Sequence, residues 1–252
     1  MLENLKKILR GRHNSLKTKY YILPRDYILE LLFLICGKKW IDFYKFRMDR
    51  EARKAGSANA PIADKYLAGG KPQAAFILSH GLKPGEKLLD YGCGVLRLRL
   101  WLEGHQAIYC GVDISGQRIR QGLAMLEERG IDTRNDKIVV VNDYEMTGLD
   151  EKDFDFIWAA SVYTHMPVDE IIMSMSQIKK IMSPTGKFIF TFSPAPGNEV
   201  IRSNQKDWFQ PDRVIENCAR KAGFDITILD RWEESGLGGK AAILTLPSNL
   251  AS

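Results

Sequence analysis

Residues 83–247 alternate between short apolar runs and longer mixed segments, and this alternation limits the fold more than any other feature of the sequence. The apolar runs have the length of strands and leave no polar face, so each predicts a strand that is covered on both sides. Helix-length segments separate most of them, which is typical of parallel strands with helices on both faces of a sheet. The predicted strands are Lys87–Tyr91, Ala107–Val112, Lys137–Val141, Phe154–Ala160, Lys187–Phe192, Phe224–Leu229 and Ala241–Leu246.

The connection between the last two predicted strands differs from the others. It runs through Gly236, Gly238 and Gly239 and leaves no room for a helix. Strands joined in this way are expected to be antiparallel neighbours. The sequence therefore predicts an α/β fold with a doubly wound, seven-stranded sheet, in which six strands are parallel and one is antiparallel. The intervening helices are expected at residues 95–104, 116–130, 168–182 and 211–222.

A glycine turn follows the first predicted strand. Gly92 and Gly94 permit a tight turn and let the backbone approach a ligand closely. Asp113 follows the second strand, where a carboxylate in a doubly wound fold accepts both hydroxyl groups of a ribose. Together these residues predict a site for a nucleoside-containing ligand. An N-cap for the helix that starts near Gly116 is the alternative role of Asp113.

The glycine turn does not fit the dinucleotide or phosphate-loop patterns. The dinucleotide fingerprint GxGxxG requires a third glycine, and Arg97 stands in its place, while a GxxxxGK[ST] loop is absent. The segment Leu88–Gly94 instead resembles motif I of class I S-adenosylmethionine-dependent methyltransferases, a hydrophobic run followed by D/E-x-G-x-G-x-G. The resemblance implies S-adenosylmethionine as the cofactor and assigns contacts with it to Asp90, Gly92, Cys93 and Gly94.

Four later segments resemble the motifs that follow in this family, in the same order. They are Cys110–Ser115, Val141–Tyr144, Phe154–Pro167 and Met182–Phe192. The resemblance assigns further cofactor contacts to the first three of them, namely Asp113, Ile114, Asp143, Tyr144 and Ala160. Two positions depart from the family pattern. Leu96 stands where a third motif-I glycine is common and is expected to tighten the methionine end of the pocket, and Thr185 replaces a glycine of a peripheral turn.

Methyl transfer from a sulfonium is an in-line displacement, which needs a general base only when the acceptor must lose a proton. His165 is the candidate catalytic base, because it follows strand four on the rim where such folds bind ligands. A structural histidine that caps the turn before Pro167 is the alternative. Arg97, Tyr163 and Trp232 are candidate contacts for the acceptor, with ordinary packing or solvent exposure as the alternative for each.

The expected activity is methyl transfer to a small-molecule acceptor, free or linked to a lipid or glycan, with O-methylation favoured over N-methylation. No Asn/Asp-Pro-Pro-Tyr segment follows strand four, where the chain reads Ser161–Thr164, and this disfavours nucleic-acid and protein amides as acceptors. Two alternatives stay open. One is a Rossmann-type NAD(P)-dependent oxidoreductase, against which Arg97 and the terminal hairpin argue, and the other is a catalytically inactive S-adenosylmethionine-binding partner subunit.

The front of the chain is basic. Residues 1–60 carry fourteen Lys or Arg and six Asp or Glu, a net charge of +8, whereas the remainder carries −3. Helices are expected at residues 1–12, from Tyr27 to Cys36 with Gly37 as the stop, and at Trp40–Ala55. We therefore predict a basic helical extension, residues 1–70, before a methyltransferase domain, residues 71–252.

Three roles are open for this extension: a lid over the acceptor pocket, contact with an anionic membrane through residues 1–50, and contact with nucleic acid. No recognisable module supports the third. The apolar run Tyr27–Gly37 is shorter than the about 20 residues that span a bilayer. The four cysteines are too scattered for a disulfide or zinc framework. The sequence predicts a cytoplasmic protein without a metal site, with peripheral membrane association as the alternative.

Overall fold

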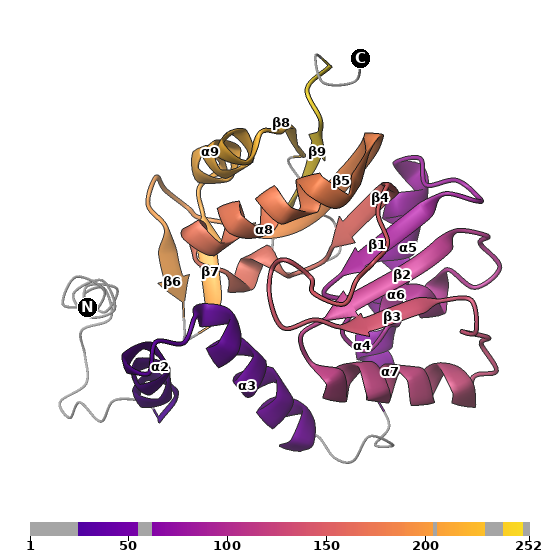
Figure 1. Ribbon diagram of the computed structural model, residues 1–252, viewed down its shortest axis with the longest axis horizontal. Helices are drawn as coiled ribbons and strands as arrows, with labels where there is room; N and C mark the ends of the chain where they lie inside the picture. The colour runs from indigo at the N-terminus through magenta and orange to yellow at the C-terminus, as the bar shows by residue number, and fades with distance from the viewer. Residues whose placement is uncertain (1–24, 55–61, 204–205, 230–238, 249–252) are drawn as a thin grey trace.

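The computed structural model describes residues 25–54, 62–203, 206–229 and 239–248. Its central sheet has the order β3-β2-β1-β4-β5, all parallel, and continues from β5 through β9 to β8 (Figure 1). β9 is antiparallel to both β5 and β8, so β8 runs in the direction of β5. These seven strands confirm the prediction of six parallel strands and one antiparallel strand. Their bounds are β1 Lys87–Tyr91, β2 Ile108–Asp113, β3 Lys137–Val140, β4 Phe154–Ala159, β5 Met182–Pro194, β8 Asp225–Leu229 and β9 Lys240–Thr245.

Two short strands were not predicted, β6 (Ile201–Ser203) and β7 (Asp207–Gln210). They form an antiparallel pair, and β7 runs parallel to the last two residues of β5, pairing Ser193 with Phe209. With them, the sheet of the described residues has nine strands. The pair exists because β5 continues past the end of β4 and offers its own unpaired backbone groups to β7. Strands of three and four residues with half-buried side chains carry too little pattern to be recognised in a sequence.

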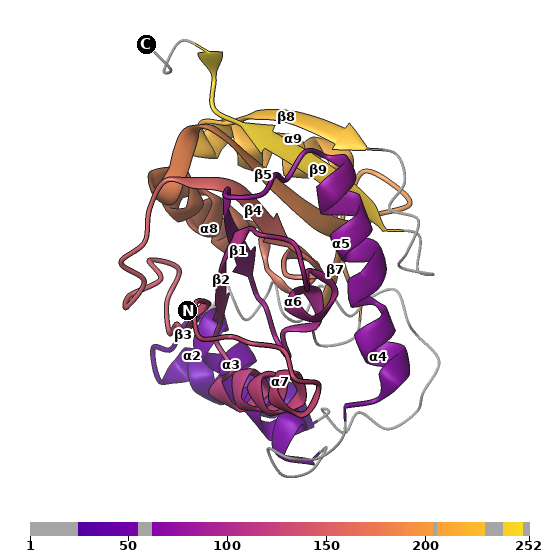
Figure 2. The same ribbon diagram turned by 90° about the vertical axis from the view of Figure 1, so that its right-hand side faces the viewer.

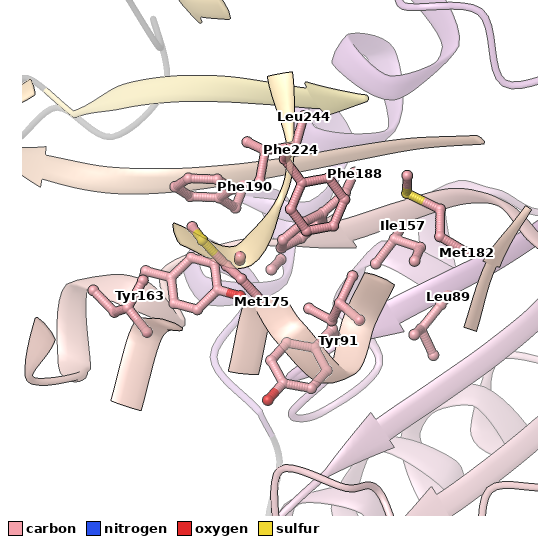
Figure 3. Packing of buried hydrophobic residues seen from close by; sticks show 14 of the residues in the cluster. Leu89, Tyr91, Ile157, Tyr163, Met175, Met182, Phe188, Phe190, Phe224 and Leu244 are labelled. Atoms are coloured by element: carbon pink, nitrogen blue, oxygen red, sulfur yellow. The ribbon is translucent and has the colours of Figure 1, made fainter. Parts of the chain in front are cut away.

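Helices cover both faces of the sheet, because neighbouring residues of a strand point to opposite sides. Leu88 packs with α5 (Gly70–Ser79), α6 (Arg97–Trp101) and α7 (Gly116–Glu128), together with the short α4 (Asp64–Ala68). Leu89 packs on the other face with α8 (Val168–Ile181) and α9 (Asp212–Ala222). Figure 2 shows α5 and α6 on one side of the strands and α8 on the other. Figure 3 shows the second cluster, in which Met175 of α8 meets the aromatic side chains of β5.

The described part of the N-terminal extension consists of α2 (Arg25–Ile35) and α3 (Trp40–Lys54). Gly37 ends α2 with a backbone φ of +71°, a conformation that glycine adopts without strain. α3 packs beside α7, and both extension helices lie at the edge of the molecule that also carries β6 and β7 (Figure 1). Both helices were predicted. The helix expected at residues 1–12 lies outside the described residues.

The two extension helices are fixed to the β6–β7 pair by a buried ion pair. Glu30 of α2 accepts hydrogen bonds from both Nη atoms of Arg202 in β6, at 3.0 and 2.8 Å. The Arg202 guanidinium also lies 4.9 Å from the ring centroid of Trp40 and 5.0 Å from that of Trp208. This arrangement holds α2, α3, β6 and β7 together as one layer.

In the part of the chain that the structure describes, no helix is long and apolar enough to cross a membrane. The same residues contain no group of three or more His, Cys, Asp or Glu side chains that could hold a metal ion.

Candidate active site

A cavity opens where β1, β2 and β4 end at their carboxyl termini, and α3 lies across it. Nine of the residues assigned to the cofactor from the sequence line this cavity, as do His165 and Arg97. The nine are Asp90, Gly92, Cys93, Gly94, Asp113, Ile114, Asp143, Tyr144 and Ala160. The fold thus brings together segments that lie up to 75 residues apart in the chain, between Asp90 and His165. This is where doubly wound folds bind nucleoside ligands.

The two glycines of the turn serve different purposes. Gly92 has a φ of +81°, and a Cβ built there would lie 2.5 Å from Cγ2 of Val162, so packing excludes a side chain. Gly94 has a φ of +55° and lines the cavity, but the nearest atoms to a Cβ built there are 4.0 Å away. A side chain at Gly94 would therefore extend into the cavity itself. Glycine at this position keeps that space open for a ligand.

Leu96, where a third motif-I glycine is common, keeps the backbone conformation of glycine. Its φ and ψ are 59° and 30°, in the left-handed region that costs a non-glycine residue about 1 kcal/mol or more. The side chain is completely buried and packs against α7, where a Cβ at Gly122 would lie 3.0 Å from Leu96 Cγ. Leu96 is not among the residues that line the cavity. The expectation that it tightens the methionine end of the pocket was wrong, because the left-handed turn directs its side chain into the core.

Asp113 at the end of β2 organises the cavity floor. Its Oδ2 accepts a hydrogen bond from the Gly94 N–H at 2.9 Å, and its Oδ1 accepts one from the Ser115 N–H at 2.7 Å. Burial raises the pKa of this carboxyl, while the two backbone N–H groups and the Arg118 guanidinium oppose the rise. Ser115 also donates from its hydroxyl to Asp49 of α3 at 2.6 Å. The acid therefore connects the glycine turn to the helix that lies over the cavity.

Asp90 at the end of β1 is almost completely buried, with 4% of its surface exposed. Its Oδ2 accepts a hydrogen bond from the Tyr109 hydroxyl at 2.7 Å. Burial raises the pKa of the Asp90 carboxyl to about 7, although the Tyr109 hydrogen bond and the charge of Arg97 oppose this rise. A buried carboxyl of this kind is stabilised in its charged form by any cation that enters the cavity.

The side of the cavity beyond β3 is formed by Asp143 and Tyr144. Asp143 accepts a hydrogen bond from the Thr147 N–H at 2.9 Å, which closes the loop after β3. The Tyr144 hydroxyl donates to Glu170 of α8, and the second oxygen of Glu170 accepts from the Trp40 N–H at 3.1 Å. Burial raises the pKa of both Tyr144 and Glu170. Glu170 thus joins the loop after β3 to the start of α3.

His165 lies in the short 3-10 turn Tyr163–His165 after β4. Its Nδ1 is 2.9 Å from Oδ1 of Asp207 in β7 and 3.3 Å from the carbonyl oxygen of Lys206. The imidazole stacks on the ring of Tyr44 at a centroid distance of 5.4 Å and an interplanar angle of 27°. The Trp40 indole N–H donates to the His165 carbonyl oxygen at 2.9 Å. α3 and β7 therefore hold the histidine from two sides.

Two arginines stand at the cavity wall near the glycine turn. The Arg97 guanidinium lies 4.9 Å from the ring centroid of Tyr66, and Arg118 donates to the Tyr66 hydroxyl at 3.4 Å. All three residues line the cavity. The positive charge of Arg97 opposes the rise in the pKa of Asp90, and the positive charge of Arg118 opposes the rise in the pKa of Asp113.

Two sequence-predicted acceptor contacts are not part of this site. Tyr163 is completely buried and is not among the residues that line the cavity. Its ring packs against Phe190 at 4.7 Å and its hydroxyl is hydrogen-bonded to Ser174 at 3.1 Å, so the structure places it in the core (Figure 3). Tyr163 therefore has a packing role, and the prediction that it contacts the acceptor was wrong. Trp232 lies outside the described residues.

Sequence reasoning missed several residues that the fold adds to the site. Trp40, Tyr44 and Met48 of α3 line the cavity, as does Arg118 of α7, and Asp207 supports His165. A partial signal existed for α3, whose aromatic residues are concentrated in its first turns, but nothing in the sequence indicates which surface they cover.

The fold is a doubly wound α/β fold, and its cavity lies at the carboxyl ends of the strands, where such folds bind nucleoside-containing ligands. The comparisons point to the class of enzyme. Residues 89–190 match the family model of the methyltransferase domain. This match supports a class I S-adenosylmethionine-dependent methyltransferase with S-adenosylmethionine as its cofactor. This outcome disfavours the oxidoreductase alternative.

Solved structures agree on the fold. An S-adenosylmethionine-dependent methyltransferase from Clostridium acetobutylicum is 14% identical, with a TM-score of 0.57 over 71% of this chain and 92% of that chain. The glycopeptide N-methyltransferase MtfA, solved with S-adenosylmethionine, is 12% identical, with a TM-score of 0.58 over 71% and 94%. The magnesium protoporphyrin IX methyltransferase from Synechocystis PCC 6803, solved with S-adenosylhomocysteine, is 18% identical, with a TM-score of 0.55 over 88% and 99%.

Proposed function

We propose that the chain transfers the methyl group to a small-molecule acceptor that binds in the part of the cavity beneath α3, and that an oxygen nucleophile is favoured over nitrogen. The observation that carries this proposal is the contact between His165 Nδ1 and Asp207 Oδ1 at 2.9 Å, in a histidine that lines the same cavity as the glycine turn. A histidine held by a carboxylate in this way is a general base for a hydroxyl group.

The cofactor fits the residues present. The open space at Gly94 would hold the methionine portion, and Asp90 would offer a buried carboxyl to its ammonium group. Asp113, with Ile114 beside it, would accept hydrogen bonds from the ribose hydroxyls, and Asp143 and Tyr144 would border the adenine. Cys93 and Ala160 complete the lining on either side of the turn. Bound there, the cofactor supplies a methyl group on a positively charged sulfur, which is an activated leaving group.

The contribution of the chain is to position the acceptor and to remove its proton. When the His165 ring is neutral, Nδ1 carries the proton that faces Asp207, which leaves Nε2 as the basic nitrogen. Asp207 fixes this tautomer and stabilises the imidazolium that forms when Nε2 takes the acceptor proton. Holding two reactants in line contributes on the order of 7–11 kcal/mol in favourable cases. A neutral amine acceptor has its own lone pair and depends much less on such a base.

We propose that α2 and α3 act as a lid within an extension that covers residues 1–70, before a methyltransferase domain that covers residues 71–252. Trp40, Tyr44 and Met48 cover the cavity, and their helix is anchored to the cavity floor through Asp49 and Ser115. A lid excludes water from the cavity, and it leaves an aromatic wall against the acceptor. Arg97 at the opposite wall is the residue we assign to an anionic group of the acceptor or cofactor.

The acceptor class includes molecules linked to a lipid or a glycan, and peripheral membrane contact through residues 1–50 belongs to this proposal. A glycopeptide N-methyltransferase and a magnesium protoporphyrin IX methyltransferase are both among the structural neighbours. Their different acceptors are consistent with the rule that pocket loops vary independently of the fold.

The experiment that tests the base is a comparison of His165→Gln and Asp207→Asn with the native protein. Isotopically labelled S-adenosylmethionine is incubated with a panel of hydroxyl, carboxyl and amine acceptors, and S-adenosylhomocysteine release is measured against pH. We expect His165→Gln to lower kcat on hydroxyl acceptors by about 10²-fold or more, with cofactor affinity unchanged. His80→Gln, whose ring contacts Phe76 and does not line the cavity, is the matched control.

Two results would contradict the proposal. If only amines are methylated, O-transfer is wrong. If His165→Gln raises KM while kcat and its pH dependence stay unchanged, the histidine contributes to binding and is not the base.

A further inference from the structure

Helix α2 presents an apolar face to solvent. Ile28, Leu32 and Ile35 follow one another at helical spacing, and 45%, 49% and 58% of their surfaces are exposed. The opposite face of the helix is fixed against the protein, because Glu30 is buried in its pair with Arg202 and Phe33 packs on Phe43 at 5.9 Å. α2 therefore has only one orientation available, and that orientation leaves its apolar side chains uncovered.

This face is the largest concentration of exposed apolar residues in the described chain. Four of the twelve exposed large hydrophobic residues lie on the eleven residues of α2, with Leu34 as the fourth. The other eight are spread over at least six other elements. Single exposed apolar residues are normal, whereas a contiguous stripe marks a surface that contacts something. We refer to Ile28, Leu32 and Ile35 as the α2 face.

Positive charge borders the α2 face. Lys38 and Lys39 lie in the short connection between α2 and α3 and are exposed. Residues 1–24, which precede it, contain six Lys or Arg and one Asp or Glu, a net charge of +5 that equals the net charge of the entire chain. Of the two acids in α2, Asp26 and Glu30, Glu30 is buried in its pair with Arg202 and offers no negative charge to the surface. Apolar side chains beside lysines are the chemistry of a helix that lies in the headgroup region of an anionic bilayer.

We propose that α2 is a peripheral membrane-binding element, which places its apolar face among the acyl chains of an anionic lipid surface with Lys38 and Lys39 at the headgroups. A second copy of the chain is a poorer occupant, because pairing two α2 faces would bring together like charges from both copies. Neither α2 nor any other described helix is long enough to span the bilayer, so the contact is interfacial. The proposal does not depend on the identity of the acceptor or on the role of His165.

The proposal predicts which vesicles the full-length protein binds. Cosedimentation is measured with vesicles of phosphatidylcholine alone and of phosphatidylcholine with phosphatidylglycerol, at low and high salt. We expect binding to the anionic vesicles, weakened by salt. Leu32→Ser should lower the partition coefficient on the order of tenfold, because a leucine leaves the membrane. The matched control is Leu78→Ser, a leucine that is 39% exposed on α5, which lies far from α2 in Figures 1 and 2, and it should bind like the native protein.

A second variant tests the charges without altering the apolar face. Lys38→Gln with Lys39→Gln should weaken binding to anionic vesicles by about fivefold per lysine and leave binding to neutral vesicles unchanged. Thermal unfolding and S-adenosylmethionine binding of each variant establish that the fold is intact. Three results would overturn the proposal: no binding of the native protein to anionic vesicles, equal binding by Leu32→Ser, or a dimer in sedimentation velocity that Leu32→Ser dissociates.

Discussion

Asp90→Asn tests the electrostatics of the cavity floor directly. Asp90 is almost fully buried, and burial raises the pKa of its carboxyl to about 7. Asparagine has the same shape and retains an oxygen that accepts the hydrogen bond from the Tyr109 hydroxyl, but it carries no charge and does not titrate. The variant therefore removes the buried charge and leaves the packing in place.

The magnitude follows from the two pKa values. An acid whose pKa is higher in the folded state binds its proton more tightly there, so its contribution to stability is fully present below about pH 4 and is lost as the pH rises to about 7. With a pKa of about 4 in the unfolded chain and about 7 in the folded one, the native protein loses roughly 3 kcal/mol of stability between about pH 5 and about pH 8 on account of Asp90. The variant has no such loss.

The assay is urea unfolding of both ligand-free proteins across this pH range at constant ionic strength. Because all other groups titrate in both proteins, the difference between their free energies of unfolding isolates Asp90. As the pH rises from about 5 to about 8, we expect Asp90→Asn to become more stable relative to the native protein by about 2–3 kcal/mol. A difference that stays constant to within about 0.5 kcal/mol would refute the assignment of a raised pKa to this carboxyl.

Three further changes test other parts of the structure. Leu96→Gly should lower the free energy of unfolding by about 2–3 kcal/mol in urea titrations, because the lost burial of the leucine side chain outweighs the relief of its left-handed backbone. A gain in stability would mean that the backbone strain is the larger effect. Asp113→Ala should weaken S-adenosylmethionine binding on the order of 10²-fold or more in isothermal calorimetry, since the carboxylate that would accept two hydrogen bonds from the ribose hydroxyls is removed; NADH serves as the negative control, and undiminished binding would disprove the ribose contact. Glu30→Gln should cost about 3 kcal/mol by removing the negative charge that Glu30 presents to the buried Arg202 guanidinium. Thermal unfolding of Glu30→Gln, Arg202→Gln and the double variant should show strong non-additivity, whereas simple additivity would mean that the pair contributes little.

Several features of the protein could be read from local sequence. The strands β1 to β5, β8 and β9, and the antiparallel direction of β9, follow from the alternation of apolar runs and from a glycine-containing segment before Lys240 whose sequence leaves no room for a helix. The glycine turn and Asp113 could be recognised because the ends of adjacent parallel strands must meet at one edge of the sheet. These are properties of short segments and of chain connectivity, and they do not depend on how side chains pack.

Other features depended on contacts between distant segments. The partner of His165, Asp207, lies 42 residues away on β7, a strand that forms only because β5 extends beyond its neighbour. Tyr163, two residues before His165, points into the core because the 3-10 turn directs the two side chains to different surroundings. No periodicity in the sequence indicates such a difference within a three-residue turn.

The sequence by itself determined the class of fold and the position of the cofactor turn, since both follow from hydrophobic periodicity and from the backbone freedom of glycine. Only the tertiary structure decided which surface of α3 covers the cavity, and which surface of α2 is left to solvent. Both helices are apolar or aromatic on more than one side, so their own pattern permits several orientations. The buried pair of Glu30 with Arg202 and the hydrogen bond from Ser115 to Asp49 select one of them, because a buried charge or hydroxyl must find its partner.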